Sequence, residues 1–317
     1  MTKTIEPVDA DDLLGQVARL FFERQLTKVE IASRLGISRF RVARLLDRAL
    51  AEGVVRIEFR DTPVQDRALA ARVAERFVIA RCVVAIDGAP ATAVARLGAE
   101  TVDGLLEPGE AIGIAWGSTV ARVVGAMPSR DDASIHVVQL AGSSASLEAA
   151  TDPGDLTRVL AERLGARNHR IHAPAFVESA ELRAALVRQT EVGDTVGRFG
   201  AIDIALIGIG AFGSSDVAAS SSLLRSGALS TSEVARLTRL GAVGDLLVHP
   251  FTADGVFVAP DLAERAIAIS IDELRRVPSV VAVAAGPAKV DAIRGALRTG
   301  VVGVLVTDAA TARMLVA

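Results

Sequence analysis

The sequence predicts an α/β protein in two parts, a small helical segment at residues 1–60 and a doubly wound parallel sheet in residues 61–317. Two short helical patterns separated by a glycine turn occupy residues 27–48. Short apolar runs then alternate with helical patterns through the rest of the chain, which is typical of a parallel sheet with helices on both faces. Half of the 317 residues are hydrophobic but only 3% are aromatic, so the core is expected to be mainly Ala, Val, Leu and Ile.

Composition narrows the class of protein. The net charge is −3, so any binding to nucleic acid must come from a local basic patch. The single cysteine, Cys82, lies in the apolar run CVVAI and is interpreted as a buried thiol, which excludes a disulfide framework and fits a reducing compartment. The N-terminal stretch MTKTIEPVDADD has no apolar signal core and no long apolar window follows, so we expect a cytoplasmic protein without a membrane partner.

Residues 11–25 predict the first helix. Leu14, Val17, Ala18 and Phe21 follow helical spacing on one face, and Asp11 or Asp12 is placed to cap its start.

Residues 27–48 predict a helix-turn-helix. Thr27 followed by Glu30 forms a capping box, Gly36 permits the left-handed turn that ends the first short helix, and Ser38 caps the second. Ala32 is small where the two helices must approach closely. The shared core is expected to comprise Ile31, Leu35, Ile37, Val42 and Leu45.

The charge of the second short helix indicates DNA binding. Residues 34–48 contain five arginines and Asp47, so they carry +4 while the rest of the chain carries −7. At helical spacing Val42, Leu45, Leu46 and Ala49 face the core, and Phe40 and Arg44 point the opposite way. The alternative is a solvated charged face. The expected DNA-contacting residues are Thr27, Ser38, Arg39, Phe40, Arg41, Arg44 and Arg48.

Three of these residues have expected roles in the DNA groove. Arg44 is the best candidate for a bidentate contact to guanine, Phe40 for a thymine methyl group, and Arg39 for a phosphate. Residues 52–60 predict a short strand, a wing or a strand that packs on the helices, and residues 61–66, with Pro63, predict a linker.

The alternation in residues 61–317 sets the sheet. Strands are predicted at 82–86, 111–115, 135–140, 203–209, 280–285 and 302–307. Helices are predicted at 91–104, 118–127, 155–165, 179–189, 232–240 and 287–299. In such folds ligands bind beyond the carboxyl ends of the strands, so the loops that follow strands are the candidate sites.

Four such loops and one lysine stand out. Residues 115–124 open a helix with Gly117, Ser118 and Thr119, which suits an anion, although a plain helix cap is the alternative. Residues 139–146 and the glycine-rich 208–216 are the next two loops, and either is also consistent with a simple connection. The fourth, 241–255, exposes Asp245 or uses it as a turn residue. Lys289, one turn into a helix, can reach a phosphate or carboxylate, or lie on the surface.

The sequence gives no sign of a metal or cofactor. The four histidines, at 136, 169, 172 and 249, lack metal-ligand spacing, and no GxGxxG fingerprint with a following acidic residue is present. We therefore expect no cofactor, no metal and no nucleotide-dependent oxidoreductase.

Ordered motifs along nearly the whole chain resemble one family. The N-terminal stretch VARLFFERQLTKVEIASRLGISRFRVARLLDRALAEGVVRI is followed in order by IGIAWGSTV, DIALIGIG, GAVGDLL with FTADG, AISIDELRRVPSVVAVAAG and VGVLVTDAATARMLV. Together they resemble the SorC-type sugar-binding transcriptional regulators, which are related to the deoxyribonucleoside regulator. The resemblance implies a winged-type helix-turn-helix, a Rossmann-like effector domain similar to sugar-phosphate isomerases and deaminases, no enzymatic activity, and a homo-tetramer or dimer on operator DNA.

The resemblance also implies an effector site. Gly117, Ser118 and Thr119 would hold the phosphate or acid end of a sugar, polyol or sugar phosphate. Asp245 would bind its hydroxyls and Lys289 its phosphate. Gly142, Ser143 and Gly210 complete the expected effector-binding residues.

Two departures qualify this expectation. The family often has a glycine pair where residues 141–144 read AlaGly-SerSer, and no lysine is present there to form a Schiff base, so covalent capture of an aldehyde is not expected. Residues 211–222 are also rich in serine. The alternative function is an active sugar-phosphate isomerase or deaminase with a DNA-binding head, for which only Asp245 and His249 offer themselves as acid and base.

Overall fold

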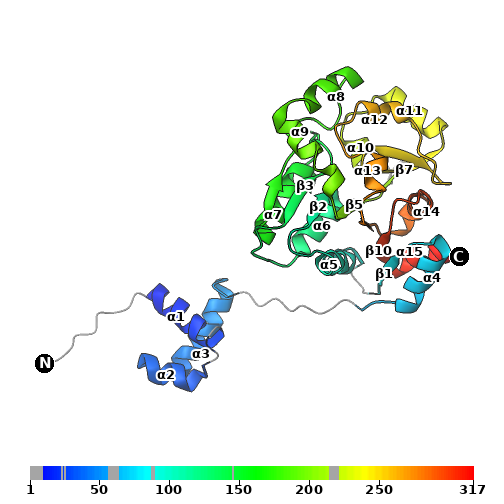
Figure 1. The fold of residues 1–317 in the computed structure, drawn as a ribbon. Coiled ribbons are helices and arrows are strands. Elements are labelled where there is room, and N and C mark those ends of the chain that lie inside the picture. The colour runs from blue at the N-terminus through cyan, green and yellow to red at the C-terminus, as the bar shows by residue number, and fades with distance from the viewer. Residues whose placement is uncertain are drawn as a thin grey trace. The chain divides into compact units, whose positions relative to one another are not determined.

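The chain forms two compact units in this computed structural model, Met1–Thr62 and Pro63–Ala317, called here the N-terminal and C-terminal units. The structure describes residues 10–22, 24, 26–55, 64–86, 90–144, 146–213 and 221–317. Figure 1 traces both units, and each is considered by itself.

The N-terminal unit consists of α1 (Ala10–Phe22), α2 (Lys28–Leu35) and α3 (Arg39–Ala51). The Thr27 N–H and hydroxyl donate to the Glu30 carboxylate at 2.8 and 2.7 Å, which confirms the capping box. Gly36 ends α2 at φ 65°, where a side chain would be strained, and the Ser38 hydroxyl accepts from the Arg41 N–H at 3.2 Å. The predicted caps of the two short helices are therefore confirmed.

The core of this unit is the face predicted for each helix. Val17, Ile31, Val42 and Leu46 pack together and are buried, and Leu14, Ala18 and Ala49 form an adjoining cluster. The first predicted helix is α1, which spans Ala10–Phe22. The predicted cap at Asp11 or Asp12 stays a prediction, because those side chains lie outside the described part of the chain.

The segment after α3 differs from the predicted strand where it is described. Residues 52–55 form a turn and bend, in which the Val55 N–H donates to Ala49 O at 3.0 Å. Residues 56–60 of the predicted wing and residues 61–63 of the predicted linker lie outside the described residues. Linker residues 64–66 pair along the first strand of the sheet, where the Asp66 N–H donates to Val84 O at 2.9 Å.

The C-terminal unit is built on seven parallel strands in the order β1-β10-β9-β5-β2-β3-β4. Their bounds are β1 (Arg81–Ala85), β2 (Ala111–Ile114), β3 (His136–Gln139), β4 (Arg167–His169), β5 (Ile204–Gly208), β9 (Ser279–Val283) and β10 (Val304–Asp308). All six apolar runs predicted as strands belong to this sheet, which confirms the α/β fold. The edge strand β4 was not predicted, because its residues Arg-Asn-His carry no apolar signal.

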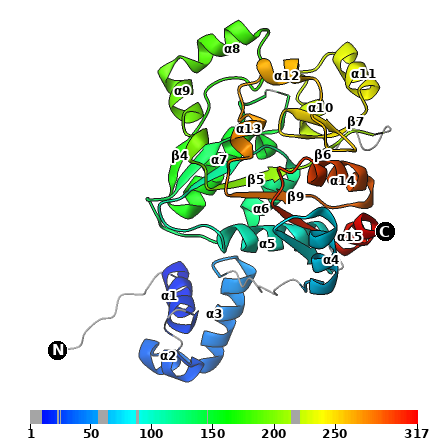
Figure 2. The same cartoon turned by 45° about the vertical axis from the view of Figure 1, so that its right-hand side comes forward.

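Helices and a second small sheet cover both faces of the large sheet (Figure 2). Val83 packs in a cluster with α5, α6 and α7, whereas its neighbour Val84 packs with α4, α14 and α15. Burial on both sides explains why the strands are apolar at consecutive positions. The helices are α4 (Arg67–Phe77), α5 (Pro90–Asp103), α6 (Ser118–Ala126), α7 (Pro153–Leu164), α8 (Ala180–Val187), α9 (Thr190–Val196), α10 (Ser222–Arg225), α11 (Thr231–Arg239), α12 (Pro260–Glu264), α13 (Ile271–Leu274), α14 (Val290–Arg298) and α15 (Ala309–Val316), with short 3₁₀ turns η1 (Ala149–Thr151), η2 (Phe199–Ala201) and η4 (Pro287–Lys289).

The second sheet is antiparallel and was predicted as loops. It consists of β6 (Gly210–Ala211), β7 (Ala242–Leu246) and β8 (His249–Thr252). The β7–β8 hairpin turns at Leu247, a buried residue with φ 55°. Regions 208–216 and 241–255 were predicted as loops because of their glycines, but tertiary pairing makes parts of both into strands.

Cys82 is buried in β1, as predicted, and burial raises the pKa of its thiol to about 12. In the described part of the chain no helix is long and apolar enough to cross a membrane.

Candidate effector pocket and DNA-facing surface

The candidate pocket lies where the strand order of the large sheet reverses. From β2 the chain continues outward to β3 and β4, and it then returns to β5 on the other side of β2 and continues to β9 and β10. Loops at the carboxyl ends of β2 and β5 therefore separate and leave a hollow of about 390 Å³, including its open mouth. It is lined by Ala115, Trp116, Gly117, Ser118, Thr119, Val120, Gly208, Ile209, Gly210, Ser222, Asp245, Leu247 and Lys289. We call it the switch-point pocket.

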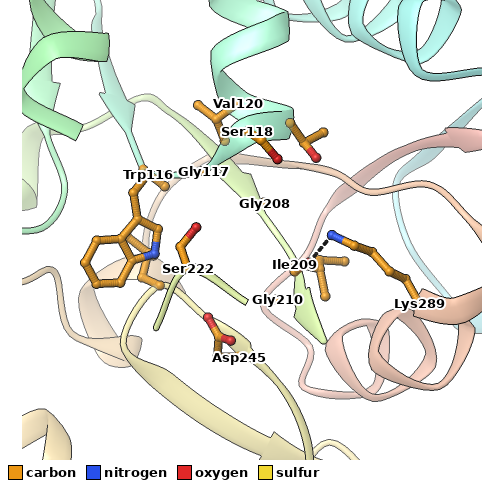
Figure 3. Close-up of a pocket in the computed structure, with 13 residues that line it drawn as sticks. Trp116, Gly117, Ser118, Val120, Gly208, Ile209, Gly210, Ser222, Asp245 and Lys289 are labelled. Atoms are coloured by element: carbon orange, nitrogen blue, oxygen red, sulfur yellow. Dashed lines mark hydrogen bonds between the residues drawn. The ribbon is translucent and has the colours of Figure 1, made fainter. Parts of the chain in front are cut away.

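The first wall is the N-terminus of α6. Gly117 takes φ 115°, a backbone conformation that side chains rarely adopt, and it offers no side chain to cap the helix. Because the first N–H groups of a helix have no partner within it, those of α6 are available to an anion at the pocket. The side chains of Ser118 and Val120 lie beside this helix end in Figure 3.

The second wall is a buried carboxyl group. Asp245, on β7, is 2% exposed and accepts a hydrogen bond from the Ser221 hydroxyl at 2.5 Å. Burial raises the pKa of Asp245 to about 7, while Ser221 and the charge of Lys289 act in the opposite direction. Gly210 lies opposite Asp245 in the β6–β7 ladder, and a Cβ there would come within 2.1 Å of Asp245 Oδ1. Gly210 is thus needed for this close approach.

The third wall is basic. Lys289 Nζ donates a hydrogen bond to Ile209 O at 3.1 Å (Figure 3). Burial lowers the pKa of Lys289, and the negative charge of Asp245 partly opposes this effect. Arg225 and Arg122 add to this lowering, so both guanidinium groups lie near enough to Lys289 to interact with it electrostatically. Arg122 follows Ser118 by one helical turn, and Arg225 is on α10, which also supplies Ser222. Lys289 thus has two further cations near it, which makes this wall of the pocket suitable for an anionic ligand.

Six of the predicted effector residues converge on this pocket: Gly117, Ser118, Thr119, Gly210, Asp245 and Lys289. The prediction missed Trp116, Ser222, Arg122 and Arg225. Trp116 is the only tryptophan of the chain and is 4% exposed. Its indole nitrogen lies on the side of the ring toward Ser222 (Figure 3).

The structure places Gly142 and Ser143 away from this pocket. A Cβ on Gly142 would come within 2.5 Å of Pro174 O, so this glycine permits a close packing of two backbones. The Ser143 hydroxyl donates to Asp152 Oδ1 at 2.9 Å and lines a separate hollow with Ser144 and Ser226. In the serine-rich segment 211–222, residues 214–220 lie outside the described residues.

The second acid–base candidate also lies elsewhere. His249 lines an apolar cavity on the other side of the β7–β8 hairpin, and its Nε2 is 2.9 Å from Ile269 O. Burial lowers the pKa of His249. Within the described ranges, no three His, Cys, Asp or Glu side chains are grouped to hold a metal ion.

The N-terminal unit presents an exposed basic face on α3. Arg39, Arg41 and Arg44 are exposed and form no ion pair among the described residues, while the Arg48 Nε bonds Glu52 at 2.6 Å. Phe40 is 68% exposed, and the Arg39 guanidinium lies 4.9 Å from the centre of its ring. This face of α3 thus presents one exposed aromatic ring among exposed arginines. The other two predicted contacts, Thr27 and Ser38, are exposed helix caps.

Comparison with known proteins places these features in context. The family described as a sugar-binding domain matches residues 61–317. The erythritol catabolism regulatory protein EryD of Brucella abortus is 32% identical over 315 residues, which cover 97% of this chain and 98% of that protein. The sorbitol operon regulator of Klebsiella pneumoniae is 29% identical over 321 residues, with 97% and 99% covered. The crystal structure of full-length SorC from Klebsiella pneumoniae aligns with a TM-score of 0.77 at 28% identity, over 98% of this chain and 100% of that one.

Proposed function

The chain belongs to the family of SorC-type sugar-binding transcriptional regulators, and from this we propose that a ligand in the switch-point pocket controls its binding to operator DNA. The ligand class is a sugar, a polyol or a sugar phosphate. Two relatives are named for erythritol catabolism and for the sorbitol operon, so polyols and their phosphates are the first candidates.

The observation that carries this proposal is the convergence of an uncapped helix N-terminus, a lysine and a buried carboxyl group on one pocket. The α6 N-terminus and Lys289 suit the phosphate or acid end of a ligand. The Asp245 carboxyl group suits hydroxyl groups, because it can accept hydrogen bonds when ionised and donate one when protonated. With a pKa of about 7, Asp245 can do either near neutral pH.

We propose that α3 reads the operator. Arg44 would contact guanine, and Phe40 would contact a thymine methyl group. The DNA backbone or neighbouring bases would be contacted by Arg39, Arg41 and Arg48. The helix starts at Thr27 and Ser38 would lie beside the DNA. The exposure of the arginines and Phe40 supports this assignment. A regulator of chromosomal DNA works in the cytoplasm, which is the compartment we propose.

We propose that the regulator works as a homo-oligomer, a dimer or tetramer, in which the effector shifts the population between two arrangements of the copies. Such a shift requires that the effector bind one arrangement more tightly than the other. The spacing of paired N-terminal units over DNA half-sites would then change with effector.

A ligand screen on the whole chain tests the pocket assignment. A panel of sugars, polyols and their phosphates is added, and thermal unfolding and Trp116 fluorescence are measured. A ligand at a hundred times its Kd should stabilise the chain by about 2.7 kcal/mol. Lys289 is the only lysine in residues 61–317, so its protection from amine acylation locates the ligand by mass spectrometry.

The variant Lys289→Gln tests whether the ligand found in the screen occupies this pocket. This variant should lose about tenfold or more in affinity for phosphorylated ligands, because a charge-assisted hydrogen bond is lost. A ligand that stabilises the chain, leaves Lys289 fully reactive and binds Lys289→Gln equally well would contradict the assignment.

The alternative function is an active sugar-phosphate isomerase or deaminase. Its support is the raised pKa of Asp245, since a group with a pKa near 7 can transfer protons at neutral pH. The second expected member of an acid–base pair, His249, does not line the switch-point pocket. We therefore propose a sensor without turnover. Assays on pentose and hexose phosphates test this, and turnover abolished by Asp245→Asn would establish the enzyme.

A further inference from the structure

A second polar cluster lies at the β3–β4 edge of the large sheet, among residues that do not line the switch-point pocket. His136 on β3 and His169 on β4 face each other, with 2.8 Å between Nδ1 of the first and Nε2 of the second. In the pairing of β3 with β4, His136 lies beside Arg167 and Val138 lies beside His169. Residues two apart on a strand point to the same face, so these four side chains share one face of the sheet. We call His136, Arg167, His169 and Arg198 the His/Arg cluster; Figure 2 shows β4 near α9, the helix that leads to Arg198.

The cluster is basic and has no acidic partner among the described residues. Neither arginine forms an ion pair there, and both are exposed, while the two imidazoles are half-buried. Burial, together with the charges of Arg198, His136 and Arg167, lowers the pKa of His169 to about 4. Burial, Arg198 and Arg167 also lower the pKa of His136. The acidic residues on surrounding elements form no ion pair with the cluster: Glu110, Asp131, Asp132, Glu191, Asp194 and Asp203.

Two of these acids already accept hydrogen bonds from other groups. The Asp203 carboxylate accepts from the Ala111 N–H at 2.8 Å, and the Asp132 carboxylate accepts from the Ser134 N–H and hydroxyl. The cluster therefore depends on solvent or on an added anion for its counter-charge.

The imidazole pair supplies donors as well as charge. When both rings are neutral they hold two N–H groups, of which one is used inside the pair and one is left over. If the pair takes up one proton, the internal hydrogen bond remains and two N–H groups are available. Together with two guanidinium groups, this is the donor set that a tetrahedral oxyanion requires.

We propose that the His/Arg cluster binds a phosphate-type oxyanion through Arg167, Arg198 and the His136–His169 pair, with uptake of one proton by the pair. Binding and protonation favour each other, because the anion stabilises the charged pair by the same amount that the charged pair stabilises the anion. Affinity for the oxyanion therefore rises as the pH falls below the pKa of the anion-bound pair, and it levels off only below the lowered pKa of the free pair. The site is independent of the switch-point pocket and of its ligand.

Histidine NMR on the full chain tests the proposal, with inorganic phosphate as the probe. The chain has four histidines, and none of them lines the switch-point pocket, so histidine Cε1 signals report phosphate at the cluster alone. Phosphate, compared with chloride at equal ionic strength, should move the His136 and His169 signals and raise their apparent pKa. His172, which lies in the loop after β4, and His249 should not respond.

Paired variants separate the cluster from other phosphate sites. Arg167→Gln with Arg198→Gln changes exposed side chains only and should weaken the phosphate response about tenfold or more. Arg158→Gln removes an exposed arginine that is already paired with Glu162, and Lys289→Gln removes the pocket lysine; both should respond like the original chain.

A duplex DNA arm identifies the source of the phosphate group. A response to free phosphate alone indicates a small phosphorylated ligand, and a response to duplex DNA as well indicates backbone phosphates. Unmoved His136 and His169 signals with both probes, or an unchanged response in the double arginine variant, would overturn the proposal. Neither result would bear on the effector pocket, whose ligand is detected through Trp116 and Lys289.

Discussion

Gly210→Ala tests whether the close approach of β6 and β7 is what places the carboxyl group in the pocket. The new methyl group would lie 2.1 Å from Asp245 Oδ1 and 2.6 Å from its Cγ, so the carboxyl group must move. Movement would break the 2.5 Å hydrogen bond from Ser221. A lost hydrogen bond to a charged group costs about 1.5–3 kcal/mol, and forced repacking adds about 1–3 kcal/mol. We expect a total loss of roughly 2.5–6 kcal/mol in the free energy of unfolding.

Gly208→Ala is the matched control. Gly208 lines the same pocket two residues earlier, but a Cβ there would meet only Val120 Cγ2, at 3.8 Å, which is an ordinary contact. Its stability should change by less than about 0.5–1 kcal/mol. Guanidinium unfolding followed through Trp116 fluorescence measures both variants at the pocket itself. Equal stability of the two variants, or an unmoved Asp245 pKa in Gly210→Ala, would refute the reasoning.

Three further outcomes are expected. Burial raises the pKa of Asp245 from 3.8 to about 7, so between these pH values the folded chain keeps a proton that the unfolded chain has lost. The free energy of unfolding should therefore fall as the pH rises from about 4 to about 7. Asp245→Asn should remove up to about 4 kcal/mol of this pH dependence, measured by unfolding at a series of pH values. Arg44→Ala should cost about 1–3 kcal/mol of operator affinity and relax the preference at one base pair. Arg41→Ala should weaken binding to DNA of every sequence equally if Arg41 contacts phosphate. Fluorescence anisotropy at several salt concentrations distinguishes the two variants. Gly142→Ala should destabilise the chain by about 1–3 kcal/mol through its contact with Pro174 O, without changing effector affinity of the folded protein in calorimetry.

Local signals in the sequence determined the two short helices of the N-terminal unit. The capping box at Thr27, the turn at Gly36 and the cap at Ser38 act within a few residues, so no tertiary information was needed to predict them. The other six strands of the large sheet were equally clear, because strands buried on both faces are apolar at most consecutive positions. The three-residue edge strand β4 and the β6–β8 sheet depend on pairing partners far along the chain. β4 has no apolar residue to signal a strand, and glycine and proline within β6–β8 favoured loops.

The pocket was predictable only in part, for a topological reason. Gly117, Asp245 and Lys289 were expected because they follow apolar runs or glycine turns. Gly142 follows β3, one strand away from the point where the order reverses, and its loop packs against the backbone at Pro174. Arg225 reaches the site on α10, a four-residue helix that lacks a sequence pattern of its own. Residues brought in by such short segments require the fold to be known.

The burial of Cys82 makes the chain behave as cysteine-free toward thiol reagents. A thiol with a pKa of about 12 carries almost no thiolate near neutral pH, and the thiolate is the reactive form. Since Cys82 is the only cysteine, one introduced thiol can be labelled without altering the native core. Val29, 63% exposed on α2, offers such a position, and Val29→Cys would carry a spin label on every copy. In the proposed oligomer, electron spin resonance distances between copies would then measure how far apart the N-terminal units stand with and without a ligand.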